Sequence, residues 1–143
     1  MTPPPQDTAR LVIPSDPRRI AEADEFLEST LRRYGIHESL VTDLAIAASE
    51  LVNNAIVHGN KRDPAKVVTI TVALAGTDVV VTVADQGSGF DPTSIPDPLA
   101  EENLLREVGR GVFIVRSLMD EVRFERGPHG ETVVVARKNL AAT

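Results

Sequence analysis

A short segment with a carboxylate, two carboxamides and a histidine is the first candidate for chemistry. It reads Ser49-Glu-Leu-Val-Asn-Asn-Ala-Ile-Val-His58, in a run with helical spacing. At about 100° per residue, Glu50 and Asn54 lie at the edge of the apolar stripe and His58 lies close to it, whereas Asn53 points away. Glu50 and Asn54 would suit proton abstraction and Mg²⁺ coordination. A solvated glutamate and a helix-end asparagine would produce the same pattern.

A second candidate lies at the end of a predicted strand and reads Val83-Ala-Asp85-Gln-Gly87-Ser-Gly89-Phe90. Two glycines after the acid let the backbone approach a ligand closely. A partly buried Asp85 can accept a hydrogen bond from an exocyclic amine. The pattern is neither a Walker A sequence, because its lysine is absent, nor the GxGxxG order of a dinucleotide-binding turn. Taken in isolation, it is also a common turn.

The third candidate is Glu107-Val-Gly109-Arg110-Gly111, which opens a predicted helix ending near Met119. Glycines at a helix N-terminus expose N–H groups, and the helix dipole favours phosphate there. Many junctions between a loop and a helix have this composition. By itself the segment is therefore a weak indication of a phosphate site.

Elements of regular structure are predicted around these three segments. Helices are expected from Pro17 to Gly35 and over residues 38–58, with Gly59 as the C′ residue of the second. Strands are expected at residues 10–13, 67–74, 79–84, 122–125 and 131–137, with a hairpin at 75–78. The connection over residues 85–110 is too long for an ordinary loop, so we expect a lid over 91–108. This order predicts an α+β fold, a sheet with helices on one face.

The composition excludes several classes of protein. The chain has 143 residues, no cysteine and a formal net charge of −6, from 15 Lys and Arg against 21 Asp and Glu. There is no disulfide framework or thiolate zinc site, and the acidic balance argues against a dedicated nucleic-acid binder. No apolar run approaches the ~20 residues of a membrane span. We expect a cytoplasmic protein with one domain at residues 10–138 and tails at 1–9 and 139–143.

In this order the three segments resemble the GHKL (Bergerat-fold) ATP-binding superfamily. In that superfamily an N-box helix carries the Mg²⁺-binding asparagine, a D-x-G-x-G box holds adenine, and a G-x-G box after a lid cradles phosphates. The matching residues are Asn54, then Asp85, Gly87 and Gly89, then Gly109 and Gly111, and Gly130-Glu-Thr132 is similar to the late G-x-T element. The resemblance covers residues 10–138. It implies a two-layer α/β sandwich with a mixed, mainly antiparallel sheet, helices on one face and an ATP lid.

Within the superfamily, Glu-Leu-Val-Asn-Asn-Ala-Ile-Val-His-Gly resembles the bacterial anti-sigma factor serine/threonine kinases. A chain of this length has no room for the extra domains of histidine kinases, gyrases or chaperones, which favours this branch. The family's N-box glutamate, matched by Glu50, is the general base for a serine on a STAS-fold anti-anti-sigma protein. The resemblance implies ATP and Mg²⁺ as cofactors, a homodimer, and a sigma factor as a further candidate partner.

The resemblance also assigns the remaining residues of the nucleotide site. Asn54 would hold the metal, and His58, Val112 and Thr132 would join the glycines around the nucleotide. The family often places a lid arginine near the γ-phosphate. Arg106 aligns with that position only after a shift of one residue, so Arg106 and Arg110 are both candidates.

Two other functions are compatible with these residues. One is a non-catalytic, nucleotide-dependent binding module that sequesters a sigma factor or another partner. Its mark would be a missing N-box Glu or Asn, and the presence of Glu50 and Asn54 favours the kinase. The other is a plain ATPase, and the small size of the chain argues against it. An active kinase can also sequester a sigma factor, so these two roles are not exclusive.

Overall fold

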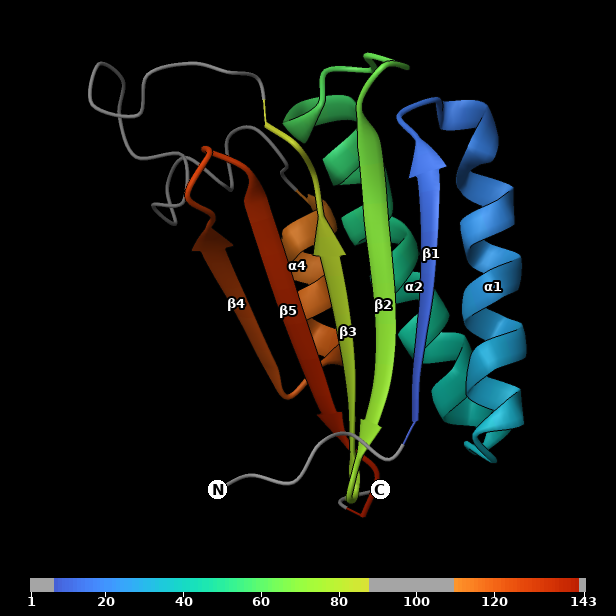
Figure 1. The fold of residues 1–143 in the computed structure, drawn as a ribbon. Helices are drawn as coiled ribbons and strands as arrows, with labels where there is room; N and C mark the ends of the chain where they lie inside the picture. The colour runs from blue at the N-terminus through green and yellow to red at the C-terminus, as the bar shows by residue number, and fades with distance from the viewer. Residues whose placement is uncertain (1–6, 88–109, 142–143) are drawn as a thin grey trace.

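The computed structural model describes residues 7–87 and 110–141, and these residues form one sheet with helices on one face (Figure 1). The sheet has five strands in the order β1-β2-β3-β5-β4, and each neighbouring pair is antiparallel. The predicted α+β fold is confirmed. The expected lid lies outside the described residues. In chain order the elements are β1 (Asp7–Pro14), η1 (Pro17–Arg19), α1 (Ile20–Arg33), α2 (Glu38–Asn54), η2 (Ala55–Gly59), β2 (Val67–Ala75), β3 (Asp78–Ala84), α4 (Arg110–Leu118), β4 (Glu121–Arg126) and β5 (Thr132–Asn139).

The core lies between the sheet and the helices. Successive side chains of a strand point to opposite faces, so the β-branched runs bury every second residue. The helix-facing positions of the two central strands β2 and β3 are almost completely buried: Val68, Ile70, Val72, Val79, Val81 and Val83. Opposite them lie the buried apolar residues of α2, which packs against both α1 and α4.

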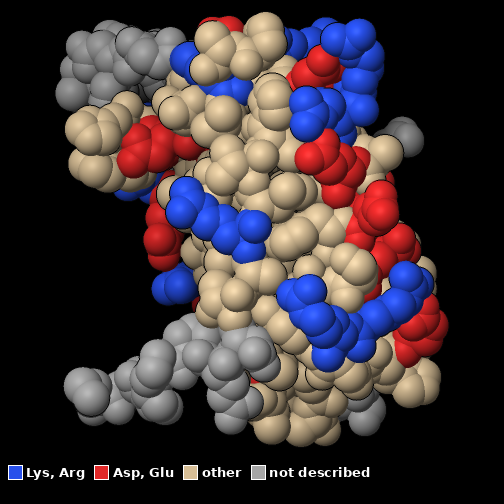
Figure 2. Space-filling model, turned by 45° about the vertical axis from the view of Figure 1, so that its right-hand side comes forward, with Lys and Arg blue, Asp and Glu red and all other residues tan. Residues whose placement is uncertain are grey.

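The first helix begins and ends as its sequence predicts. The Asp16 carboxylate accepts a hydrogen bond from the Arg18 N–H at 3.0 Å, which makes Asp16 the N-cap of the η1 turn. Gly35 has a φ of +78°, the left-handed conformation that often follows a helix. Figure 2 shows acidic and basic side chains next to one another on the face of the molecule that is turned forward. The Arg19–Glu22 and Arg32–Glu38 ion pairs, which involve residues of η1, α1 and α2, are both exposed.

The second helix has the predicted extent, but its last turn is wider than expected. Residues Ala55–Gly59 form a π-helix, in which the Asn60 N–H donates to the Ala55 carbonyl at 2.8 Å. Gly59 does not have a positive φ, whereas Lys61 and Arg62 do, at 52° and 58°. The prediction of Gly59 as the C′ residue is therefore wrong, because Gly59 still belongs to the helical segment and Asn60 is its C-cap. π-turns of this kind are frequent at functional sites.

The helical segment Glu38–Gly59 is long and apolar enough to cross a membrane by length and composition, contrary to the expectation from the sequence. Half of its apolar window is buried inside the fold, where Leu44, Ala48 and Leu51 are almost inaccessible. This is the position of a core helix, so the length of the segment is only a weak indication of a membrane span.

The sheet also extends beyond the predicted domain limits. Strand β1 begins at Asp7 and its first residues pair with Leu74, Ala73 and Val72, although residues 7–9 were expected in a tail. At the other end of the chain, the Leu140 N–H donates to the Thr77 carbonyl at 2.7 Å. Residues 7–9 and 140 join the fold because short polar segments gain backbone hydrogen bonds from a neighbouring strand or turn.

Candidate active site

The described candidate residues gather at one end of the sheet, the upper end in Figure 1. Strand β3 ends there and β5 begins there, because Ala84 pairs with Val133 in the antiparallel ladder. The C-terminal end of α2 and the first turn of α4 lie at the same end. We call this part of the molecule the site end.

Asp85 is the most deeply buried charged residue of the site end, with 6% of its surface exposed. Its Oδ1 atom accepts the Gly87 N–H at 2.9 Å and the Thr132 N–H at 2.8 Å. Burial raises the pKa of Asp85 above its ordinary value, and the two N–H groups only partly oppose this shift. Both hydrogen bonds go to Oδ1, so Oδ2 keeps its capacity to accept a further donor.

Gly59 belongs to the site, although its sequence context predicted only a helix end. A Cβ atom at residue 59 would overlap with Oδ2 of Asp85 and lie 2.6 Å from its Cγ. Such a close approach requires a residue without a side chain. The wide turn η2 brings Gly59 one turn beyond Asn54, so the helix and the Asp85 carboxylate meet. The only signal in the sequence was the glycine itself.

The structure brings Glu50 and Asn54 together with the start of α4. A Cβ atom at Gly111 would lie 2.8 Å from Oε2 of Glu50 and 3.4 Å from Nδ2 of Asn54. Both α2 side chains are half-buried, as expected at the edge of the apolar stripe, and Asn53 is exposed. A carboxylate and a carboxamide thus meet the start of a helix, whose first N–H groups have no acceptor within the helix itself.

Gly87 and Gly130 meet across the ends of β3 and β5. Gly87 has a φ of +73°, and a Cβ atom there would lie 2.9 Å from the Gly130 carbonyl oxygen. Both the backbone conformation and the close approach require glycine at position 87. The Gly87 N–H reaches Asp85 for this reason, so the glycine helps to orient the carboxylate.

The remaining predicted site residues belong to the same elements or lie outside the described parts of the chain. His58 is exposed, because the π-turn adds a residue to its turn and rotates it away from the apolar stripe. Val112 is buried in the first turn of α4, so only its backbone N–H group could bind a ligand there. Arg110 begins α4. Three predicted residues lie outside the described parts of the chain: Gly89, Arg106 and Gly109.

Within residues 7–87 and 110–141, no group of three or more histidine, aspartate or glutamate side chains is placed to hold a metal ion. The oxygen atoms of Asn54 and Glu50 are hard ligands beside the start of α4. A cation that keeps water and phosphate ligands, as Mg²⁺ does, needs only one or two protein oxygens. The donor set therefore fits Mg²⁺ bound together with a nucleotide.

Comparison with known proteins shows the family to which the chain belongs. Residues 13–137 match the histidine kinase-like ATPase domain family. The chain is 35% identical over 103 residues to the anti-sigma F factor of Geobacillus kaustophilus, covering 71% of this chain and 70% of that protein. It is 29% identical over 140 residues to the serine-protein kinase RsbW of Bacillus subtilis, covering 94% and 86%.

A similar fold occurs in a crystal structure of the RsbU and RsbW domains of Rv1364c from Mycobacterium tuberculosis. That structure has a TM-score of 0.70 at 22% identity, covering 95% of this chain and 32% of that one. Fold and family thus define the class of histidine kinase-like ATPase domains. The chain belongs to this family, in the branch of the bacterial serine-protein kinases and anti-sigma factors. The expected resemblance is confirmed.

Proposed function

We propose that this chain is an ATP-dependent protein serine/threonine kinase and anti-sigma-type regulator that phosphorylates a STAS-domain anti-anti-sigma protein in the cytoplasm. The protein-kinase class is that of relatives named serine-protein kinase. One observation carries the proposal: Glu50, Asn54 and Gly59 on one helical segment meet Gly111 and Asp85, which come from separate parts of the chain.

Asp85 is the group we assign to the adenine base. Its carboxylate has one oxygen held by two backbone N–H groups and a second beside Gly59. An oriented carboxylate oxygen accepts the exocyclic amine of adenine and repels the carbonyl oxygen that other purines carry there. Gly87 and Thr132 act through Asp85, because their N–H groups orient it.

The first turn of α4 is the part we assign to the phosphates. The N–H groups of a helix's first turn have no acceptor within the helix, and with the helix dipole they favour an anion beside Gly111 and Val112. Gly111 also lets this helix start approach Glu50 and Asn54 closely. Gly109, Arg110 and the lid residue Arg106 remain predicted phosphate contacts, and His58 remains a predicted contact of the nucleotide.

Asn54 is the residue we assign to Mg²⁺, through its carboxamide oxygen. When bound, Mg²⁺ would neutralise part of the phosphate charge. Asn54 lies beside Gly111, so the side chain and the N–H groups of α4 face the same region.

Glu50 is the residue we assign as general base. A serine hydroxyl of the partner would attack the γ-phosphorus as its proton passes to the Glu50 carboxylate. The bond from the γ-phosphorus to the bridging oxygen then breaks, which leaves phosphoserine and ADP. Phosphoryl transfer depends mainly on positioning and on charge stabilisation, so one well-placed carboxylate is sufficient.

The proposal includes a homodimer and a sigma factor as a second partner. The sigma factor is included because relatives are named anti-sigma F factor.

The face of the sheet away from the helices supports the homodimer, since no described helix covers it and β-branched side chains line it. Val12, 45% exposed, lies on this face, and the inner strands add Thr69, Thr71, Val80, Thr82, Val133 and Val135. Sedimentation equilibrium would test it, with a Thr71→Arg variant expected to be monomeric.

The direct test of the kinase is transfer of a labelled γ-phosphate. The purified protein is incubated with cell extract of its source and labelled ATP, beside Glu50→Gln and Asp85→Asn variants. We expect a small labelled protein with the wild type alone, with label on serine or threonine. A protein that binds Mg-ATP but labels nothing would overturn the kinase and favour the sequestering module, to be sought by partner capture.

A further inference from the structure

A buried polar cluster lies directly behind residues 85–87, which we call the Asp85 loop. Its centre is the side chain of Asn60, 1% exposed, next to the completely buried Ser15. Neither residue was a candidate from the sequence. A buried polar group destabilises the fold unless it is hydrogen-bonded. A fully hydrogen-bonded cluster therefore favours the one arrangement of the chain in which all its partners meet.

Asn60 uses its whole carboxamide to join distant segments. Its Nδ2 donates to Oγ of Ser15 at 2.7 Å and to the carbonyl of Val67 at 2.9 Å. Its Oδ1 accepts the N–H of Gln86 at 2.8 Å. The Ser15 hydroxyl in turn donates to the Lys66 carbonyl at 2.9 Å. The end of η2, the start of β2 and the Asp85 loop are thereby held together.

Two more contacts hold the same loop. The Val67 N–H donates to Oε1 of Gln86 at 2.7 Å, and the Lys66 ammonium donates to the Gly87 carbonyl. The N–H that Asn60 binds belongs to the peptide unit between Asp85 and Gln86. Holding that unit fixes the backbone rotation at Asp85, and so the direction of its carboxylate.

We propose that Asn60 is a positioning residue that sets the base selectivity of the nucleotide site. By holding the peptide unit after Asp85, it keeps the carboxylate beside Gly59, where it distinguishes an amine donor from a carbonyl acceptor on a purine. This inference rests on the proposed function, in which the nucleotide is ATP and Asp85 contacts adenine. Lys66 supports the same loop from its other end.

The test compares Asn60→Ala with Ser15→Ala in the full chain. Both variants remove a hydrogen bond from the same buried cluster. Of these two residues, only Asn60 contacts the Asp85 loop. The readout is the ratio of the Kd for inosine triphosphate to the Kd for ATP, measured by competition at a temperature where both variants are folded. We expect the wild type to prefer ATP, Asn60→Ala to lose about tenfold of that preference, and Ser15→Ala to keep it.

A variant at the edge of the cluster covers the case in which Asn60→Ala does not fold. Lys66→Met removes the contact with Gly87, and Lys61→Met is the matched control because Lys61 is exposed. Removing a positive charge weakens both nucleotides alike, so the charge effect cancels in the ratio. We expect about a threefold loss of preference in Lys66→Met and none in Lys61→Met.

The possible results separate the two proposals. If Asp85→Asn abolishes the preference for ATP while Asn60→Ala and Lys66→Met keep it, the role of Asn60 is refuted and the adenine assignment stands. The role of Asn60 is also refuted if Ser15→Ala loses as much preference as Asn60→Ala, because the cluster then acts only through stability. A wild type without any preference overturns the adenine assignment, and the role of Asn60 with it.

Discussion

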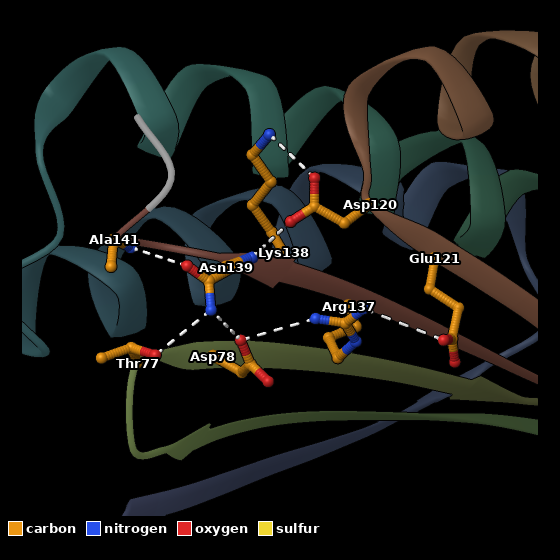
Figure 3. A network of polar contacts seen from close by, with 8 residues as sticks. All are labelled: Thr77, Asp78, Asp120, Glu121, Arg137, Lys138, Asn139 and Ala141. Atoms are coloured by element: carbon orange, nitrogen blue, oxygen red, sulfur yellow. Dashed lines mark hydrogen bonds and ion pairs between the residues drawn. The ribbon is translucent and has the colours of Figure 1, made fainter.

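The two ends of the sheet hold their carboxylates in opposite ways. At the end away from the site, which we call the network end, Asp120 lies in the turn between α4 and β4 (Figure 3). Its Oδ2 accepts the Asn139 N–H at 2.7 Å, and its Oδ1 lies 3.5 Å from the Lys138 ammonium. At the site end, Asp85 is buried and has backbone N–H groups on one oxygen only.

Polar contacts between exposed and half-buried side chains hold the network end together. Asn139 donates to Oδ1 of Asp78 at 2.7 Å, and the Arg137 guanidinium lies 3.5 Å from the same oxygen (Figure 3). These contacts connect the β2–β3 hairpin to the last strand. Surface ion pairs contribute little one by one, so this end gains a modest stability from several of them.

The pKa values of the two aspartates are shifted in opposite directions. The Asn139 N–H and the Lys138 charge lower the pKa of Asp120, whereas burial raises the pKa of Asp85. Ionised Asp120 therefore stabilises the fold, and ionised Asp85 destabilises it. A buried carboxylate that opposes folding is typical of a functional site, where a ligand supplies the missing partner.

Glu50→Gln is the substitution with the largest expected effect. It removes the proposed base but keeps the shape of the side chain beside Gly111, so ATP binding should survive. We expect phosphotransfer to fall by about 10²- to 10⁴-fold, measured as single-turnover transfer to the partner. Glu121→Gln, the same change in an exposed residue of the network end, is the control. Unchanged transfer in Glu50→Gln would remove Glu50 as the base.

Gly59→Ala is expected to affect nucleotide binding. The new methyl group would displace the Asp85 carboxylate, which removes a hydrogen bond to a charged group worth about 1.5–3 kcal/mol. By isothermal titration, the Kd for ATP should therefore rise about tenfold or more. At the network end, Gly76 has a φ of +63° and open space around it. Gly76→Ala should lower the free energy of unfolding by about 1 kcal/mol and leave the Kd for ATP unchanged.

Asp85→Asn and Asp120→Asn should have opposite effects on stability. At a pH above the raised pKa of Asp85, the nucleotide-free Asp85→Asn variant should have a higher free energy of unfolding than the wild type, because a buried charge is removed. Asp120→Asn should have a lower one, because it loses the charge that Lys138 and Asn139 stabilise. Urea unfolding measures both. If Asp85→Asn were less stable than the wild type, the buried carboxylate would not destabilise the fold.

The smallest expected effect is a difference in pH dependence. Since the folded-state pKa of Asp85 is raised, folded protein holds this proton more tightly than unfolded protein. The wild type should thus lose stability relative to Asp85→Asn as pH rises from the ordinary pKa of an aspartate to the raised one. The pKa of Asp120 is lowered in the folded protein, so ionised Asp120 stabilises the fold at a pH above the ordinary pKa of an aspartate. This stabilisation should be lost as the pH falls through the lowered pKa. Parallel pH profiles of wild type and variants would contradict both directions.

Several parts of the site could be predicted because they depend on local spacing. Glu50 and Asn54 are four residues apart, so a regular helix places them on one side, and the structure has them together at Gly111. Asp85 follows a strand whose alternation is clear, so its place at the strand end was predictable. The hairpin at residues 75–78 was also predicted, and Gly76 has the positive φ that such a turn uses.

Other parts could not be predicted because they depend on one irregular turn. The π-turn Ala55–Gly59 adds a residue to the helix, so a regular period misplaces everything after Asn54. His58 is exposed for that reason, and Gly59 contacts Asp85 instead of ending the helix. Asn60 looked like an ordinary loop residue, and only the fold buries it beside Ser15 and Gln86.

The sequence by itself determined the elements, their order and the residue types that can bind a nucleotide, because periodicity, capping and turn chemistry act over a few residues. The tertiary structure alone decided which residues meet. The contact of Gly59 with Asp85, and that of Gly111 with Glu50, join segments more than twenty residues apart. Burial, which raises the pKa of Asp85 and makes Asn60 a structural centre, arises only when the sheet and helices pack together.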